Sequence, residues 1–385
     1  MLGTLAQLLT VGAHAVGMAT HATPAMGGEA HTEGYLTQPA VMADAAWGPF
    51  QFTGLVNFEG WTLDRGELNA GVYGEGYVDR RHPHTFLHEA VLTFRTRFFS
   101  SELSLSGGRG FAPFGTDDPM VRPFVKYPAN HHLSQILERP MAMAAVRTGP
   151  LIIEGGLFSG VEPLDPEDAG DFDKLGDSWS GRATVLPRSW LEVQASYAEV
   201  VSPENQFGTG LDHHMWNASA RLQRSFGNTN FYALVEGGET TETAGDFDYF
   251  HYSTVLAEAS LERNAWRVAA RLERTVRPEE ERQLDLFRSV RPHSDNSILG
   301  TTRWLSGGLS VSRAVAYRRM QFRPFVEVLR LHAESLSEFP IIRPEDVYGS
   351  NNMWSFSFGV RSTIGSWHDR MGRYGVARIT PPLHH

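Results

Sequence analysis

Apolar and polar side chains alternate along most of this chain with a period of two. One of the clearest runs alternates Trp216, Ala218, Ala220 and Leu222 with Asn217, Ser219, Arg221 and Gln223. Strict alternation marks a β-strand with one apolar and one polar face. About fourteen such segments of roughly ten residues follow one another, and that length lets a tilted strand cross a bilayer. The pattern predicts an all-β fold, a transmembrane antiparallel β-barrel of about fourteen strands.

The connections between these segments alternate between short and long. Short turns are expected at residues 99–101, 148–150, 187–189, 227–229, 263–265 and 314–317. Longer polar connections are expected at about 63–87, 107–139, 161–177, 201–212, 239–248, 277–296 and 333–351. In bacterial outer-membrane barrels the short turns are periplasmic and the long loops extracellular, so both termini are expected on the periplasmic side.

Three parts of the chain follow from this interpretation. Residues 1–45 are expected to be an export signal and a disordered leader, because residues 2–16 are apolar and contain a small-x-small site at Ala13-His14-Ala15. The barrel is expected over residues 46–366. Residues 367–385 remain as a C-terminal tail.

Composition excludes several other classes of protein. The chain has no cysteine, which removes disulfide frameworks, thiol nucleophiles and zinc-thiolate sites. A net charge of −10 argues against a nucleic-acid partner. No run of ~18 apolar residues is present, as a membrane-spanning helix would require. A soluble β-sandwich would also alternate, but charges at mid-strand would be costly in its dry core.

Charged residues on the polar faces are the candidates for lining a pore. The predicted pore-lining residues are Arg95, Arg182, Arg221, Arg267, Arg271, Glu273 and Arg361. The longest connection, 107–139, is more basic than the chain as a whole, and its predicted constriction residues are Arg109, Arg122, Lys126 and Arg139. Such a loop narrows the lumen if it folds inward. An external lid or a subunit contact explains it equally well.

A histidine cluster follows the first long connection. His82, His84 and His88 lie beside Glu89, and neutral imidazole is a common ligand of zinc, copper and nickel. In an extended strand these histidines are too far apart for one ion, so a metal site requires the chain to fold back. The alternative is a hydrogen-bonded plug at the strand entrance. His131, in the longest connection, is a further candidate partner.

No catalytic motif stands out. The chain has no Gly-x-Ser-x-Gly elbow, no His-Glu-x-x-His and no glycine-rich phosphate loop. The sequence therefore predicts no enzyme.

Several stretches resemble a porin-like family of bacterial outer-membrane β-barrel proteins that has no settled function. They are residues 77–89 (YVDRRHPHTFLHE), 155–163 (GGLFSGVEP), the segment 114–139 with NHH at 130–132, and 175–182 with DSWS at 177–180. The resemblance covers most of the chain and implies a barrel in the bacterial outer membrane. This chain departs from the usual barrel pattern in the tail that follows its last predicted strand.

The expected function is a channel for passive passage of small polar solutes or ions. The alternatives are a metal-binding or metal-handling outer-membrane protein and, third, a barrel enzyme acting on lipid. The expected partners are outer-membrane lipid, lipopolysaccharide and small polar solutes or ions. No cofactor is expected apart from a divalent transition metal at the histidines, and the sequence does not indicate the oligomeric state.

Overall fold

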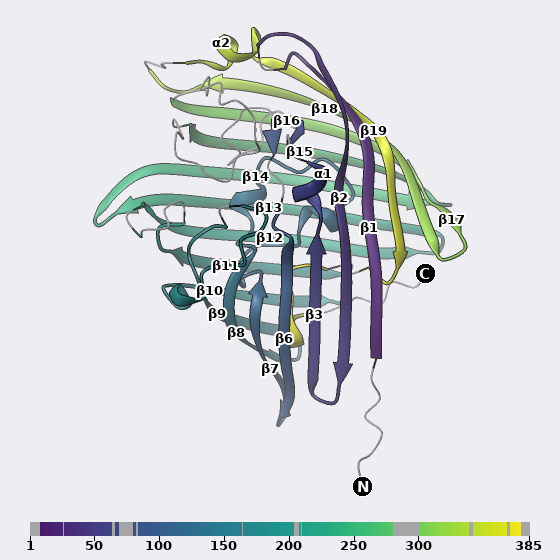
Figure 1. The fold of residues 1–385 in the computed structure, drawn as a ribbon, viewed down its shortest axis with the longest axis vertical. Helices are drawn as coiled ribbons and strands as arrows, with labels where there is room; N and C mark the ends of the chain where they lie inside the picture. The colour runs from purple at the N-terminus through teal and green to yellow at the C-terminus, as the bar shows by residue number, and fades with distance from the viewer. Residues whose placement is uncertain are drawn as a thin grey trace.

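The structure, a computed structural model, describes residues 8–25, 27–63, 66–68, 80–81, 84–163, 165–203, 208, 210–279, 300–338, 342–367 and 370–378. Within these residues one antiparallel sheet of seventeen strands forms the wall (Figure 1). The strands of the wall are β1 (Leu8–Thr23), β2 (His31–Trp47), β3 (Phe50–Asn57), β6 (Leu87–Phe98), β7 (Ser101–Gly110), β8 (Arg139–Thr148), β9 (Leu151–Phe158), β10 (Ser178–Arg188), β11 (Leu191–Val200), β12 (Asp212–Phe226), β13 (Thr229–Ala244), β14 (Phe247–Arg263), β15 (Trp266–Glu279), β16 (Gly300–Arg313), β17 (Val315–Tyr317), β18 (Met320–Ser335) and β19 (Asn352–Gly365).

Each strand pairs with its neighbours in the chain, and the last pairs with the first. The β1–β19 register runs from Gly12 opposite Gly365 to Thr23 opposite Trp354, which closes the sheet into a barrel. Closure leaves no strand edge, so every strand can satisfy its backbone hydrogen bonds within the wall. The three-residue β17 pairs only with β18, beside β16, so the wall has sixteen full strands.

Small elements lie in the long connections. These are the helices α1 (Glu59–Thr62) and α2 (Pro344–Tyr348), the pair β4 (Glu67–Leu68) and β5 (Arg80–Arg81), and the 3₁₀ turns Pro119–Val121, His131–Leu133, Phe172–Lys174 and Gly375–Ala377. Among the described residues, no helix is long and apolar enough to cross a membrane.

The predicted count of about fourteen strands is too low by two. The extra strands are β1 and β2, which lie almost entirely within residues 1–45, the segment expected to be a signal and leader. On β1 the more exposed face is small or apolar, with Ala13 and Ala15, while the buried face includes Val16 and Met18. Because apolar side chains lie on both faces of β1, its sequence shows only a weak alternation of apolar and polar residues.

The outer surface of the wall is apolar at mid-strand. Large side chains exposed there include Leu105, Ile153, Val193, Trp216, Val235, Val255, Leu272, Leu309, Val326 and Phe358. On β12 the burial alternates, so that Trp216, Ala218 and Ala220 face outward and Asn217 and Ser219 face inward. An apolar band outside a closed barrel is the surface that a lipid bilayer requires.

The outward position of Ala220 gives a direct test of this register. Replacing Ala220 by Arg should destabilise the refolded barrel by about 2 to 4 kcal/mol, the cost of a cation facing lipid near the midplane. Urea titration in lipid vesicles measures the loss. Ala220→Leu, which adds bulk without charge, is the control and should fold like the wild type; equal stability of the two variants would show that Ala220 does not face lipid.

Candidate functional site

The connection between β7 and β8 folds into the barrel. Phe114, Phe124 and Tyr127 in this segment are at most 3% exposed, although it contains little regular secondary structure. We call residues 111–138 the inner loop. Of the placements that the sequence left open, inside the barrel, an external lid or a subunit contact, the structure shows the first.

Carboxylates of the wall hold the backbone of the inner loop. Glu273 on β15 accepts hydrogen bonds from the backbone amides of residues 129 and 130, at 3.0 and 2.6 Å. Glu327 on β18 accepts from the amides of residues 125 and 126, at 2.7 and 3.1 Å. Buried amides need such acceptors because an unpaired N–H group inside a protein is costly.

Guanidinium groups of the wall hold the carbonyls of the same loop. Arg361 on β19 donates to the carbonyl oxygens of residues 122 and 124, at 3.1 and 3.2 Å. Arg271 on β15 donates to the carbonyl of Lys126 at 2.7 Å and pairs with Glu258 at 2.6 Å. Side chains of the wall therefore bind both the backbone amides and the backbone carbonyls of the inner loop.

Arg182 on β10 holds the first part of the loop. It pairs with Glu154 on β9 at 2.7 Å and donates to the carbonyls of Phe114 and Gly115, at 3.3 and 3.2 Å. The same guanidinium donates to the carbonyl of Gly372, in the C-terminal tail. One wall residue thus joins the loop and the tail.

The basic residues predicted to form a constriction are engaged in buried contacts. Arg122 lies 3.4 Å from Glu236, and Lys126 lies 2.9 Å from Glu67. At the ends of the loop, Arg109 donates to Thr85 at 3.0 Å and Arg139 pairs with Glu162 at 2.8 Å; all four cations are at most 5% exposed. Their charges serve to fix the loop.

The chain returns into the barrel after β19. Arg370 in this segment lies 2.7 Å from Asp117 of the inner loop and 2.9 Å from Glu192 of β11. Burial opposes the charge on Arg370, but the two carboxylates outweigh it and raise the pKa of Arg370 above its ordinary value. We call residues 366–378 the inner tail.

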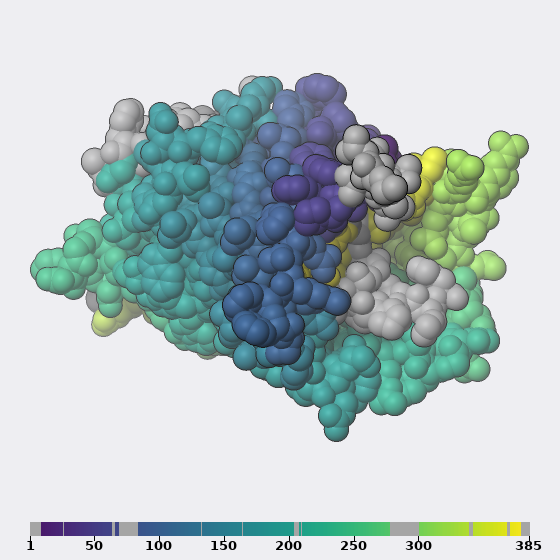
Figure 2. Space-filling view, turned by 90° about the horizontal axis from the view of Figure 1, so that it is seen from below, coloured from purple at the N-terminus to yellow at the C-terminus, as the bar shows by residue number. Residues whose placement is uncertain are grey.

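The inner tail continues along the wall. Arg373 lies 3.2 Å from Glu154, and the hydroxyl of Tyr374 donates to Glu89 at 2.5 Å. Arg378 pairs with Asp44 on β2 at 2.8 Å, so the tail crosses the interior from β11 to β2. In the view from below, yellow C-terminal residues are visible in a hollow between the purple and blue strands and the green strands (Figure 2).

A cavity of about 520 Å³ lies between the inner loop and the short-turn end of the wall. Its charged lining residues are Arg221, Arg267, Arg323, Arg361 and Glu262. Met120, Val121 and Pro123 of the inner loop line the cavity too, as do His14 and Trp367, whose rings stack at 4.8 Å.

The seven predicted pore-lining residues divide into three groups. Arg221, Arg267 and Arg361 line the cavity. Arg182, Arg271 and Glu273 point inward but are buried against the inner loop. Arg95 has inward parity on β6 and is exposed near the short turn between β6 and β7.

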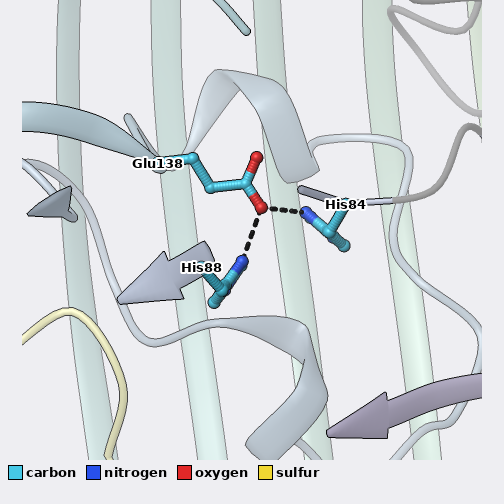
Figure 3. A group of neighbouring side chains, drawn as sticks. All are labelled: His84, His88 and Glu138. Carbon is cyan, nitrogen blue, oxygen red and sulfur yellow. Dashed lines mark hydrogen bonds and ion pairs between the residues drawn. The ribbon is translucent and has the colours of Figure 1, made fainter. Parts of the chain in front are cut away.

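Two of the three clustered histidines meet at the other end of the loop (Figure 3). The Nδ1 atoms of His84 and His88 lie 3.1 and 2.5 Å from Oε1 of Glu138. Burial alone would raise the pKa of Glu138, but the two imidazoles outweigh it and hold this pKa well below its usual range. His82 lies outside the described residues.

The carboxylate partner of these histidines is Glu138 and not the neighbouring Glu89. Glu89 instead accepts a hydrogen bond from Tyr374. His131, the other expected partner, has its ring 5.7 Å from that of His84. Sequence reasoning missed Glu138 because it is more than fifty residues from His84 along the chain, and only the return of the inner loop brings it close.

Comparisons with known proteins agree on the fold. A scan against models of known families finds no match, and a search of curated proteins finds none either. Solved structures of similar fold include OprB of Pseudomonas putida, with TM-score 0.56, 12% identity, and coverage of 93% of this chain and 94% of that chain. The anion-selective porin of Comamonas acidovorans gives TM-score 0.54, 11% identity, and coverage of 93% and 100%.

A loop-deletion form of OmpT, an outer-membrane protein of Vibrio cholerae, gives TM-score 0.54, 10% identity, and coverage of 94% of this chain and 100% of that chain. This chain has the fold of an outer-membrane porin. The fold and its apolar outer band agree with the expected location in the bacterial outer membrane.

Removing the clamp at Glu273 should release the inner loop. In Glu273→Ala two buried amides lose their acceptor, and each unsatisfied donor costs about 1 to 3 kcal/mol. We expect trypsin to cut the refolded variant after Lys126, which is buried in the wild type. Glu239→Ala removes an exposed carboxylate bound to Trp216 on the outer face and serves as the control. Equal resistance of wild type and Glu273→Ala would show that the clamp does not hold the loop.

Proposed function

We propose that this protein is an outer-membrane porin-like channel that favours small anions, with its short turns facing the periplasm. The cavity at the short-turn end supports this most directly, because four arginines and one glutamate line it. An excess of fixed positive charge in a confined space raises the local concentration of anions. The inner loop and the inner tail restrict the passage to small solutes.

The charges that line the cavity are only partly neutralised. Glu262 is shared between Arg267 and Arg323, at 2.6 and 3.1 Å. Arg221 lies 3.2 Å from Asp117, which also pairs with Arg370. Arginines therefore share carboxylates here, and positive charge is left over. The similar fold of a porin described as anion-selective is compatible with this proposal.

The inner tail fits the role of an occluding segment. It follows β19 in the chain and enters the interior from there. Its side chains Met371 and Tyr374 pack in one apolar cluster with Phe111 and Phe114 of the inner loop. Loop and tail together fill space that would otherwise be open lumen, so we propose that they set the size limit of the channel.

Selectivity should respond to the cavity charges. In the double variant Arg267→Gln, Arg323→Gln, the ratio of chloride to potassium permeability should fall, and in Glu262→Gln it should rise. A unit charge about 4 Å from an ion contributes about 1 kcal/mol in water, so we expect a change of several-fold. Reversal potentials in a potassium chloride gradient across a planar bilayer measure the ratio.

The matched control for selectivity is Arg313→Gln, since Arg313 is exposed and stacks on the outward-facing Trp266. It should leave the ratio unchanged. A wild-type barrel that prefers cations, or cavity variants that behave like this control, would contradict the proposed anion preference.

Truncation should enlarge the channel. A chain that ends at Gly365 lacks the inner tail, and we expect its single-channel conductance in planar bilayers to increase by at least about twofold, because conduction grows with the open cross-section. Deletion of residues 379–385 alone keeps Arg370, Arg373 and Arg378 and is the control. Circular dichroism verifies that both chains fold. Equal conductance of the folded truncated and control chains would argue against occlusion by the tail.

A further inference from the structure

His84, His88 and Glu138 meet at a point that the channel function does not use. One nitrogen of each imidazole and one carboxylate oxygen lie within 4.8 Å of one another, and all three residues are buried. None of these three residues lines the arginine-lined cavity. We propose that these three side chains form a binding site for one divalent transition-metal ion of the zinc type.

The backbone is shaped to bring these side chains together. Val56 on β3 is opposite Leu87 on β6, whereas the preceding Leu55 is opposite Glu89, so His88 is the extra residue of a β-bulge. A bulge redirects a side chain, and here both His88 and Glu89 face inward. Such bulges occur often beside functional sites.

Glu138 reaches the histidines through an unusual backbone conformation. Its φ is +61°, in the left-handed region that residues other than glycine seldom adopt. The residue is the last of the inner loop, immediately before β8, and its Oε1 also accepts from the amide of Thr85 at 3.2 Å. Non-glycine residues held in this region are frequent at ligand sites, where the surrounding structure maintains the strain.

Each of the two imidazoles has one ring nitrogen without a hydrogen-bond partner among the described residues. Their Nδ1 atoms face Glu138, while the Nε2 atoms of His84 and His88 are buried and have no hydrogen-bond partner in the part of the chain that the structure describes. An unpartnered polar atom in a buried position is costly unless a water or an ion satisfies it. Two imidazoles and a carboxylate are the ligand set of many zinc sites, with a water in the fourth position.

Several acidic side chains surround the site. Glu59 accepts a hydrogen bond from the amide of His84 at 3.2 Å, and Asp118 interacts electrostatically with His88. Arg109 also interacts electrostatically with Glu138. A bound divalent cation would interact favourably with these carboxylates, and it would join β6 to the end of the inner loop.

The competing explanation needs no metal. Two neutral imidazoles that donate Nδ1–H to one carboxylate would form a hydrogen-bonded plug with the same short distances. The two explanations differ in what zinc does to the protein, because only a metal site should bind the ion with defined stoichiometry and imidazole ligands.

Calorimetric titration of the refolded full-length protein with zinc chloride tests the proposal. We expect one zinc ion per barrel, and at least about tenfold weaker binding in Glu138→Gln and His88→Gln, since even the loss of an outer-shell partner costs that much. The matched control is His251→Gln, because His251 is exposed and bonded to Thr241 on the rim. It should bind like the wild type.

X-ray absorption at the zinc edge of the loaded wild type gives a second readout that does not depend on variants. Two imidazole ligands and oxygen at about 2.0 to 2.2 Å would support the site. Absence of stoichiometric binding, a spectrum without imidazole, or unchanged binding in folded Glu138→Gln would overturn it. None of these measurements depends on ion conduction, so the proposed metal site and the proposed channel function can be contradicted independently.

Discussion

The inner loop can lie inside this barrel because charged residues of the wall satisfy its backbone. An irregular segment of that length contains many amides and carbonyls, and burying them without partners would cost more than its apolar side chains could recover. Glu273, Glu327 and Arg361 remove that penalty by binding amides and carbonyls in pairs. The loop, the tail that packs on it and the cavity beneath it all depend on these contacts.

The tail follows from the same arrangement. Arg182 binds loop carbonyls and the carbonyl of Gly372, while Asp117 of the loop binds Arg370 of the tail. The tail therefore docks on the loop as well as on the wall. These contacts explain why the chain can continue past β19 without adding a strand, since described residues after Gly365 find partners inside the barrel.

Alternation in the sequence predicted the wall well, because lipid and lumen impose opposite demands on successive side chains. The inward parity of Arg182, Arg271 and Glu273 follows from it. The strands β1 and β2 were not predicted, because residues 1–45 were assigned to an export signal and leader and the buried Val16 and Met18 interrupt the polar face of β1. The partners of these charges could not be predicted, because they are backbone groups of the inner loop, and sequence pattern gives no information on where an irregular segment returns.

The inward-facing charged residues have different roles at different positions along the barrel axis. Near the middle of the wall, Arg271 and Glu273 are buried and bind backbone groups of the loop, so neither borders the cavity. Closer to the short turns, Arg221, Arg267 and Arg323 pair with carboxylates that they share with other arginines, and they border open volume. Among the residues that the structure describes, a lumen predicted to be polar throughout is thus largely packed, and the inward charge that borders the cavity lies in its short-turn half.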